Sequence, residues 1–356
     1  MDVRLDIQWA IGLEKSESLD ELVFRLLSVV EDGSSLRQAA EDCGTSYRHA
    51  WGLMRDWEQR LGAPLLILER GRGAALSDLG RTVLWAQRRA QARLAPTLDS
   101  LGAEIAEELA VLLDRTAPLR LVASHDLALE LLRQRYTARG ARKLSVQYRG
   151  SLDAVRQLIA GRCDLAGYHI PDLAQAAEIG EQFARLLPPA DYQIVRFVDR
   201  SQGLILPRGN PDRLETLADL AETEATFINR QPGSGTRLLF DHLLAQAGIQ
   251  PAEIRGYASE EFTHLAVAAM VASGAADAGF GVQAAAERFD LAFVAMAREH
   301  FLLAYRKTAL DSERLAGLIN LLQTDPDLHA AVHELPGYDA SPIGQPWPPK
   351  TSVLKT

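Results

Sequence analysis

The stretch Ala-Thr-Phe-Ile-Asn-Arg-Gln-Pro-Gly-Ser-Gly-Thr-Arg at residues 225–237 decides the fold. An apolar run typical of a strand leads into a glycine-rich loop, and leucines at helical spacing follow at positions 238, 239, 243 and 244. This order places backbone N–H groups and the positive end of a helix dipole at one point, which favours a bound anion. Ser234 and Thr236 add hydroxyls, Gly235 permits close approach, and Arg237 offers a guanidinium.

The N-terminal part of the chain has a different pattern. Residues 19–30 are amphipathic, Ser34 or Ser35 can cap a helix over residues 36–43, and Gly44 provides a tight turn. Thr45 or Ser46 then caps a third helix that ends near Leu61, and residues 64–76 are strand-like around a Gly-Arg-Gly tip at 71–73. We therefore predict a winged helix-turn-helix, a DNA-binding module, over residues 1–77.

The third helix of this module presents two faces. We expect the apolar side chains Tyr47, Trp51, Met54 and Leu61 to pack inward. The opposite face is small, polar and basic, which suits a major groove, although a solvated helix face is the simpler alternative. Residues 37–93 hold ten arginines and six acids within a chain of net charge −9. The predicted DNA-binding residues are Arg37, Thr45, Ser46, Arg48, His49, Arg55, Arg70 and Arg72.

A long helix is expected to link the DNA-binding module to the rest of the chain. Ser77 can cap it, and its helical pattern runs through residues 78–116 with a kink at Pro96. Apolar side chains near heptad spacing predict a helix–helix seam in a homodimer or higher homo-oligomer: Leu94, Leu98, Leu101, Ile105 and Leu112. The alternative is an apolar stripe that packs within its own chain.

Strands and helices alternate over residues 117–335, which predicts a mostly parallel α/β sheet. A long β-rich segment, 193–207, is expected to break at 199–202 and to cross between two lobes. A second βα unit covers about 227–294. Residues 336–356 are rich in proline and are expected to form a loop or mobile tail.

Ligands of such sheets lie beyond the carboxyl ends of the strands, near helix N-termini. Three loops qualify, at Ser124-His125, at Ser151 and at residues 234–237. A plain helix cap is the alternative for each serine, a structural role for each histidine, and a bridge to an inter-lobe carboxylate for Arg237. The predicted ligand-binding residues are Ser124, His125, Ser151, Ser234, Gly235, Thr236, Arg237, Thr263 and His264.

Two families resemble this chain. Residues 35–40 and 46–51, with the wing-like residues 61–65 and 76–80, resemble the DNA-binding domains of the molybdate regulator ModE and of LysR-type regulators. Residues 229–237, with Thr263-His264 and the segment 276–279, look like a periplasmic-binding-protein-type domain of molybdate- and tungstate-related regulators. The resemblance implies a transcriptional regulator whose two-lobed domain holds molybdate or tungstate between its lobes.

Other effectors remain open at this point, namely sulfate, a small carboxylate such as formate, and a molybdopterin-type ligand. A small-molecule binding protein without a transcriptional role is the rival function. We expect no enzyme, because the sequence has no Gly-x-Ser-x-Gly elbow, His-Glu-x-x-His motif or P-loop lysine. The histidines are too scattered to predict a metal site. No apolar run could span a bilayer and no secretory segment is evident at the start, so a cytoplasmic protein without membrane contact is expected.

Overall fold

A computed structural model describes residues 3–12, 17–69, 73–113, 117–139, 143–172 and 177–347. The chain divides into two compact units, which we describe separately. The N-terminal unit is Asp6–Ala92, and the C-terminal unit is Arg93–Thr356 together with Met1–Leu5. Helix α4 (Asp78–Leu112) contributes to both units, so the predicted linker segment is divided between them and forms no separate body.

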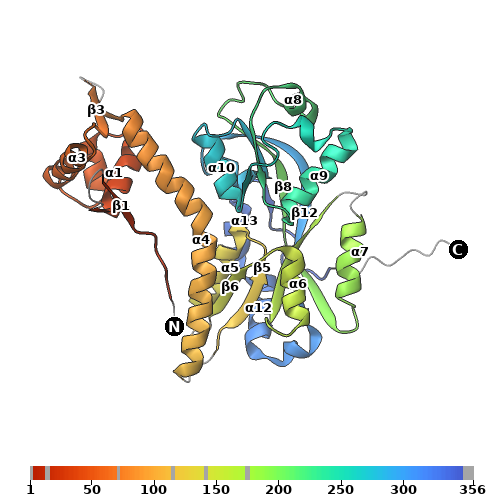
Figure 1. The fold of residues 1–356 in the computed structure, drawn as a ribbon. Coiled ribbons are helices and arrows are strands. Elements are labelled where there is room, and N and C mark those ends of the chain that lie inside the picture. The colour runs from red at the N-terminus through yellow and green to blue at the C-terminus, as the bar shows by residue number, and fades with distance from the viewer. Residues whose placement is uncertain are drawn as a thin grey trace. The chain divides into compact units, whose positions relative to one another are not determined.

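The N-terminal unit contains α1 (Glu21–Glu31), α2 (Leu36–Asp42) and α3 (Tyr47–Leu61), followed by the hairpin of β3 (Leu66–Glu69) and β4 (Gly73–Leu76). A short antiparallel pair, β1 (Trp9–Ile11) and β2 (Glu17–Leu19), precedes them. Asp20, Ser35 and Ser46 cap the three helices through their side chains. Helix, turn, helix and hairpin confirm the predicted winged helix-turn-helix (Figure 1).

The wing is held to α3 and α4 by hydrogen bonds of Glu58 and Ser77. Glu58 Oε1 on α3 accepts the backbone N–H groups of Leu65 and Leu66 at 3.0 and 3.2 Å. Ser77 Oγ accepts Gly80 N–H at 3.0 Å and so caps α4. A Cβ on Gly80 would lie 2.1 Å from the carbonyl oxygen of Leu65, so only glycine permits this approach.

The predicted inward face of α3 is partly wrong. Ala50, Met54 and Trp57 form the buried face, whereas Tyr47 is 41% exposed. The core face lies one residue away from the predicted one, because Ala50 and Trp57 fill the space toward α1 and α2. Tyr47 instead stacks on Trp51 at 6.3 Å between ring centroids, and the guanidinium of Arg37 lies 5.0 Å from the Tyr47 ring.

The C-terminal unit is built on a sheet with the strand order β10-β9-β11-β8-β12-β7-β5-β6. Parallel pairs join β5 to β6 and β7, and β9 to β10 and β11. The strands are β5 (Leu119–Ala123), β6 (Leu144–Tyr148), β7 (Leu165–Pro171), β8 (Tyr192–Leu206), β9 (Phe227–Arg230), β10 (Glu260–Glu261), β11 (Ala278–Val282), β12 (Ala292–Arg306) and β13 (Tyr338–Asp339).

Strands β8 and β12 run antiparallel through both halves of the sheet and divide it into two lobes (Figure 1). Lobe 1 comprises residues 117–198 and 300–347, and lobe 2 comprises residues 203–295. The predicted break at 199–202 is wrong, since β8 is continuous there and Arg200 pairs in register with Glu299 on β12. The polar run looked like a loop in the sequence because it is a buried polar stretch of strand.

Helices cover both lobes. Lobe 1 carries α5 (Leu127–Ala138), α6 (Ser151–Ile159), α7 (Ala177–Leu186), the 3-10 helix η3 (Lys307–Asp311), α12 (Glu313–Thr324) and α13 (Pro326–His333). Lobe 2 carries α8 (Leu217–Glu222), α9 (Gly235–Ala247), the 3-10 helix η2 (Pro251–Glu253), α10 (His264–Ala272) and α11 (Gln283–Glu287). Separate apolar clusters form the cores of the two lobes. The two-lobed α/β architecture agrees with the prediction.

The predicted C-terminal tail is wrong for residues 336–347. Strand β13 pairs with β8, Tyr338 is buried in the core of lobe 1, and Trp347 N–H bonds to the carbonyl of Ile194. Tyr338 and Ile343 provide the apolar anchors, which the surrounding prolines concealed in the sequence. Residues 348–356 lie outside the described part of the chain. Among the described residues, no helix is both long enough and apolar enough to cross a bilayer.

Candidate functional site

The candidate DNA-reading surface lies on α2 and α3 of the N-terminal unit. Of the residues predicted to bind DNA, Arg37, Ser46, Arg48, His49 and Arg55 are exposed and Thr45 is half-buried. Ser46 Oγ accepts the N–H of His49 at 3.2 Å, so this serine caps the helix that carries the other side chains. Arg70 and Arg72, predicted at the wing tip, lie outside the described residues.

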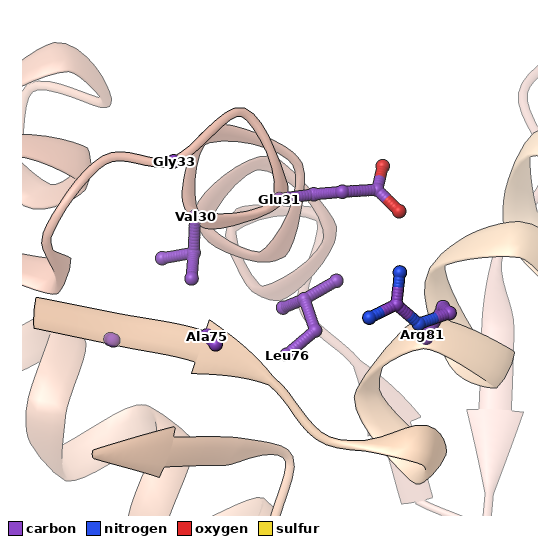
Figure 2. Close-up of a pocket in the computed structure, with 7 residues that line it drawn as sticks. Val30, Glu31, Gly33, Ala75, Leu76 and Arg81 are labelled. Atoms are coloured by element: carbon purple, nitrogen blue, oxygen red, sulfur yellow. The ribbon is translucent and has the colours of Figure 1, made fainter. Parts of the chain in front are cut away.

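A hollow in the same unit lies between the end of α1 and strand β4 (Figure 2). Its lining residues are Val30, Glu31, Gly33, Ala74, Ala75, Leu76 and Arg81. The side chains of Glu31 and Arg81 point toward one another across it, but Glu31 is already bonded to Arg88 at 2.5 Å and to Trp85 at 3.1 Å. None of the lining residues holds a buried polar atom without a hydrogen-bond partner, so we assign no ligand to the hollow.

The second candidate site lies between the lobes of the C-terminal unit, where α5, α6, α9 and α10 begin, and we call this region the cleft. The loops before α6 and α9 approach each other, because a Cβ on Gly150 would lie 3.7 Å from the carbonyl oxygen of Gly233. A Cβ on Gly235 would lie 3.9 Å from His169 Cβ. Helix N-termini from both lobes therefore meet here, and each carries N–H groups without a partner within its helix.

Three side chains of lobe 1 form a linked chain at this cleft. Ser124 Oγ lies 2.7 Å from His169 Nδ1 and 3.3 Å from Ser151 Oγ, and Ser151 Oγ also accepts the N–H of His169 at 3.3 Å. His169 Nε2 faces Asp126 Oδ2 at 3.9 Å. Burial, followed by the charge of Arg200, lowers the pKa of His169, so the imidazole is neutral at pH 7. The sequence-predicted Ser124 and Ser151 are thus brought together.

Arg200 sits where β8 crosses between the lobes and is paired with two carboxylates. Its Nη1 pairs with Asp126 and its Nε with Glu299, and all three side chains are buried. Tyr338 donates to the same Asp126 oxygen at 3.0 Å. Although burial acts to raise the pKa of Asp126, Arg200 and His169 hold it down at about 2. Asp126 and Glu299 are therefore both ionised at neutral pH.

Arg230, at the end of β9, is the buried cation that the fold does not neutralise. It donates to Gln231 Oε1 at 3.2 Å and to the carbonyl of Phe262 at 2.9 Å, and Nη1 has no partner within the described chain. Only 5% of the residue is exposed. Burial, and then the charge of Arg200, lower its pKa to about 9, so it still carries its proton at pH 7.

Two further histidines belong to the same neighbourhood. Burial is the main cause that lowers the pKa of His125 to about 4 and that of His264 well below its usual value. Arg200 and Arg230 lower both values as well, which places these four side chains within electrostatic range of one another. The Nδ1 atoms of both histidines are buried and have no hydrogen-bond partner in the described residues.

The remaining predicted ligand residues divide into two groups. Thr236 accepts a bond from Gln202 Nε2 at 3.2 Å, whereas Ser234 and Thr263 are the caps of α9 and α10. Arg237 is occupied by the fold. Its Nε bonds to Asp241 at 3.0 Å, its Nη1 to the carbonyl of Arg230 at 3.1 Å, and its guanidinium stacks on Tyr257. We therefore do not propose Arg237 as a ligand donor, and its carboxylate partner is on its own helix rather than across the cleft.

The sequence reasoning missed Arg200, Gln202, Arg230 and Glu299, and it gave His169 only as a possible donor and Asp126 only as an acid without an evident partner. Arg230 directly follows the apolar core of a strand, next to the glycine-rich loop, and this position was a usable signal. His169, Arg200, Gln202 and Glu299 come from the strand segments 165–171, 192–206 and 292–306, and Asp126 is the N-cap of α5. Among the described residues, no cluster of three or more His, Cys, Asp or Glu side chains has the arrangement of a metal site.

Lobe 2 also contacts the linker helix through one ion pair. Glu261 on β10 is the register partner of Arg230 and its side chain is fully buried. Arg93 of α4 donates from Nε to both oxygens of Glu261, each at 2.7 Å. The hydrogen bond to Glu261 is the main cause that raises the pKa of Arg93. The pair links α4 to the strand beside Arg230.

Comparison with known families accounts for both units. Residues 132–323 match the PBP superfamily domain, and residues 23–81 match the bacterial regulatory helix-turn-helix protein of the lysR family. The first match covers more than half of the chain, which belongs to the PBP superfamily. With its helix-turn-helix, it is a LysR-type DNA-binding transcriptional regulator with a small-molecule effector-binding domain. LysR-type regulators are not enzymes, which agrees with the prediction.

Individual relatives are distant. The uncharacterized protein YvgK of Bacillus subtilis is 28% identical over 228 residues, which are 64% of this chain and 73% of that protein. A phosphate-bound structure of a putative phosphate transporter substrate-binding protein from Clostridium perfringens is 13% identical, with a TM-score of 0.46, and covers 60% of this chain and 97% of its own. CbnR, a LysR-family regulator, is 19% identical, with a TM-score of 0.39 and coverage of 85% and 99%.

Proposed function

We propose that this regulator responds to a small anion held between the lobes of its C-terminal unit, with Arg230 as the anchor. The observation that carries the proposal is the buried guanidinium of Arg230, which pairs with no carboxylate and whose Nη1 has no partner within the described chain. A buried charge is costly unless it is paired, so such a group is retained where a ligand supplies the counter-charge.

The surroundings of Arg230 agree with an anionic ligand. Ser124 and Ser151 bring hydroxyls from lobe 1, and the helix start at Ser234, Gly235 and Thr236 brings N–H groups from lobe 2. Because the ligand touches both lobes, it binds more tightly when they are closed. Only this differential affinity can shift the conformational equilibrium and, through it, the DNA-bound state.

Sequence resemblance favoured molybdate or tungstate, with formate, sulfate and a molybdopterin-type ligand as alternatives. All of these are anions that the proposed anchor would attract. Arg230 alone does not discriminate among these anions. We therefore propose that the effector is an anion and that the residues named above bind it.

We further propose that two copies of the chain bind a two-fold DNA operator through α3. The supporting observation is an apolar stripe on the part of α4 that belongs to the C-terminal unit. Leu94, Leu101 and Leu112 are 45%, 44% and 80% exposed, and Ile105 is 37% exposed. A stripe at this spacing suits a helix–helix seam between copies of the chain. Arg37, Arg48, His49 and Arg55 would then meet paired half-sites.

The experiment compares Arg230→Met with Arg237→Met by calorimetry in sulfate- and phosphate-free buffer, against molybdate, tungstate, sulfate, phosphate, formate and glycolate. We expect wild type to bind at least one of these anions and Arg230→Met to lose that binding by roughly a hundredfold, since an ion-paired hydrogen bond contributes about 1.5–3 kcal/mol. Arg237→Met should retain it, because that guanidinium is occupied by Asp241 and Tyr257. Equal losses in both variants, or no anion binding at all, would contradict the proposed site.

A further inference from the structure

We propose, building on the anion site above, that the effector is a monoanion that also donates a hydrogen bond. The ligand class is a small anion with a hydroxyl or N–H group, such as a hydroxycarboxylate or a singly charged, protonated tetrahedral oxyanion. Fully deprotonated dianions such as sulfate and molybdate are then disfavoured. Two independent observations lead to this conclusion, one from charge and one from hydrogen bonding.

The charge argument starts from the groups that act on the three cleft histidines. These groups are Asp126, Glu299, Arg200 and Arg230, and each shifts the pKa of at least one of the three imidazoles. The imidazoles are neutral, and both carboxylates pair with Arg200, so Arg230 is the guanidinium of this group that a ligand can neutralise. A bound monoanion adds one buried negative charge, which helix N-termini can stabilise. A dianion adds two, and the second charge meets no guanidinium that lacks a carboxylate partner, so its desolvation would go largely uncompensated.

The distribution of these charges also favours a monoanion. Arg200 is held between Asp126 and Glu299, so its hydrogen-bonding N–H groups already face carboxylates. Of the two described guanidiniums that act on the cleft histidines, Arg230 is the one with a buried N–H group that lacks a partner. One available guanidinium can form an ion pair with one carboxylate or with one singly charged oxyanion.

The hydrogen-bond argument rests on Gln202, in the stretch of β8 between the lobes. Its side chain is fully buried, and its Nε2 donates to Thr236 Oγ1 at 3.2 Å, at the start of α9. Its Oε1 is a buried acceptor with no partner in the described chain. A buried acceptor without a hydrogen-bond partner costs free energy. The oxygens of an anion that carries only acceptors would be repelled by Gln202 Oε1. A ligand hydroxyl or N–H would satisfy it.

The orientation of the Gln202 amide follows from its neighbours. Burial raises the pKa of the Glu299 carboxyl, whereas Arg200 and, to a lesser degree, Gln202 lower it, as expected when the Gln202 amide N–H side faces the carboxylate. With Thr236 and Glu299 on the Nε2 side, the oxygen is directed away from both. This assignment leaves the acceptor, rather than the donor, without a partner in the described chain.

Matched ligand pairs test the proposal on the full chain. Acetate and glycolate differ by one hydroxyl. At about pH 6, phosphate is mainly a protonated monoanion, whereas sulfate and molybdate are dianions without a donor. Calorimetry should give glycolate at least a tenfold lower Kd than acetate, and phosphate at least a tenfold lower Kd than sulfate or molybdate, because a site built to accept a hydrogen bond rejects an analogue that lacks the donor.

The variant Gln202→Met should reduce the glycolate-to-acetate ratio to about twofold, and Gln193→Met, the same change in the lobe 1 half of β8, should leave it unchanged. Equal or tighter binding of acetate, sulfate or molybdate by wild type would overturn the donor requirement, and this comparison does not depend on the folding of any variant. If Arg230→Met abolishes such binding, the anion site stands and only the ligand class is wrong. If no anion of either kind binds wild type, both proposals fail.

Discussion

Arg93 on α4 neutralises Glu261, a fully buried carboxylate on β10, through two contacts of 2.7 Å from one guanidinium nitrogen. Glu261 lies beside Arg230 in the parallel pairing of β10 with β9. The next residue, Phe262, supplies the carbonyl that Arg230 binds. The proposed ligand anchor and the middle of α4 are thus joined by one strand pair, so a shift of Arg230 toward a ligand would displace the partner of Arg93.

The first prediction concerns this pair. Arg93→Met leaves the Glu261 carboxylate buried and unpaired, and should lower the free energy of unfolding by about 1–3 kcal/mol. Glu261→Gln removes the charge and should cost less. Both should reduce the change in operator affinity that an anion causes, while anion affinity itself falls less than threefold. Arg185→Met, which removes an exposed ion pair with Glu181, is the control. Operator affinity is measured by DNA titration with and without the anion. If the anion changes this affinity in both variants as much as in wild type, the Arg93–Glu261 pair does not transmit the effect of the anion.

The second prediction concerns the stability that is lost by burying Arg230. Its folded pKa, about 9, lies below the unfolded value of 12.5, so the unfolded chain binds more protons between these values and stability rises with pH across that window. At pH 7 the buried charge is destabilising. Arg230→Met should therefore raise the free energy of unfolding by about 1–3 kcal/mol without ligand. Chemical denaturation provides the measurement, and a destabilised variant would show that Arg230 has a partner in solution.

The same shift predicts how anion affinity depends on pH. Arg230 loses its proton as pH rises through about 9, so wild-type affinity should fall steeply there, whereas glycolate itself does not change its charge in this range. Isothermal titrations between about pH 7 and pH 10 would give the pH at which anion affinity has fallen halfway. A flat profile would exclude Arg230 as the anchor.

The third prediction separates two serines of the cleft. Ser151→Ala removes a hydroxyl that bonds to His169 N–H and lies 3.3 Å from Ser124, and anion affinity should fall about tenfold. Ser234→Ala should cause a similar loss and also lower the free energy of unfolding by about 1 kcal/mol, because Ser234 Oγ caps α9 through Arg237 N–H at 3.1 Å. Calorimetry and denaturation together distinguish these effects. Unchanged affinity in both variants would move the anion elsewhere.

The fourth prediction tests the α4 seam. Ile105→Asp places a charge in the exposed apolar stripe, where burial against a second copy would be costly. Light scattering should show a shift to monomers, and operator affinity should fall because the two half-site contacts are uncoupled. Glu108→Gln on the same helix removes a charge and serves as the control. A dimer that survives Ile105→Asp at low concentration would place the interface on another surface.

The fifth prediction tests the reading face of α3. Arg48→Ala should weaken operator binding by roughly 1–3 kcal/mol in a sequence-dependent way if the side chain contacts a base. A loss that is uniform across sequences would assign Arg48 to a phosphate instead. Arg185→Ala, on an exposed surface of the C-terminal unit, should leave the affinity unchanged. Mobility-shift titrations on operator and scrambled DNA give both values.

Local patterns in the sequence were sufficient for most of the fold. The winged helix-turn-helix, the strand β5 and the start of α9 follow from periodicity, caps and glycine positions, which depend only on neighbouring residues. The cleft was harder to predict because its buried groups come from strands that are distant in the chain. Arg200 and Glu299 meet only because β8 and β12 pair along their length, and the polar run at 199–202 looked like a loop until that pairing was known. Arg237 was favoured over Arg230 because it lies at the helix start, although the fold had already engaged it.

Tyr338 has a consequence for the order in which the regulator is completed during synthesis. Its hydroxyl donates to Asp126, a residue of the first βα unit in lobe 1, although more than two hundred positions separate the two in the chain. Every other described contributor to the cleft is translated before Tyr338. A nascent chain that already exposes its DNA-reading helix therefore still has an Asp126 carboxylate without this donor, and its effector cleft is unfinished. Recognition of DNA can mature on the ribosome ahead of the ability to respond to the effector.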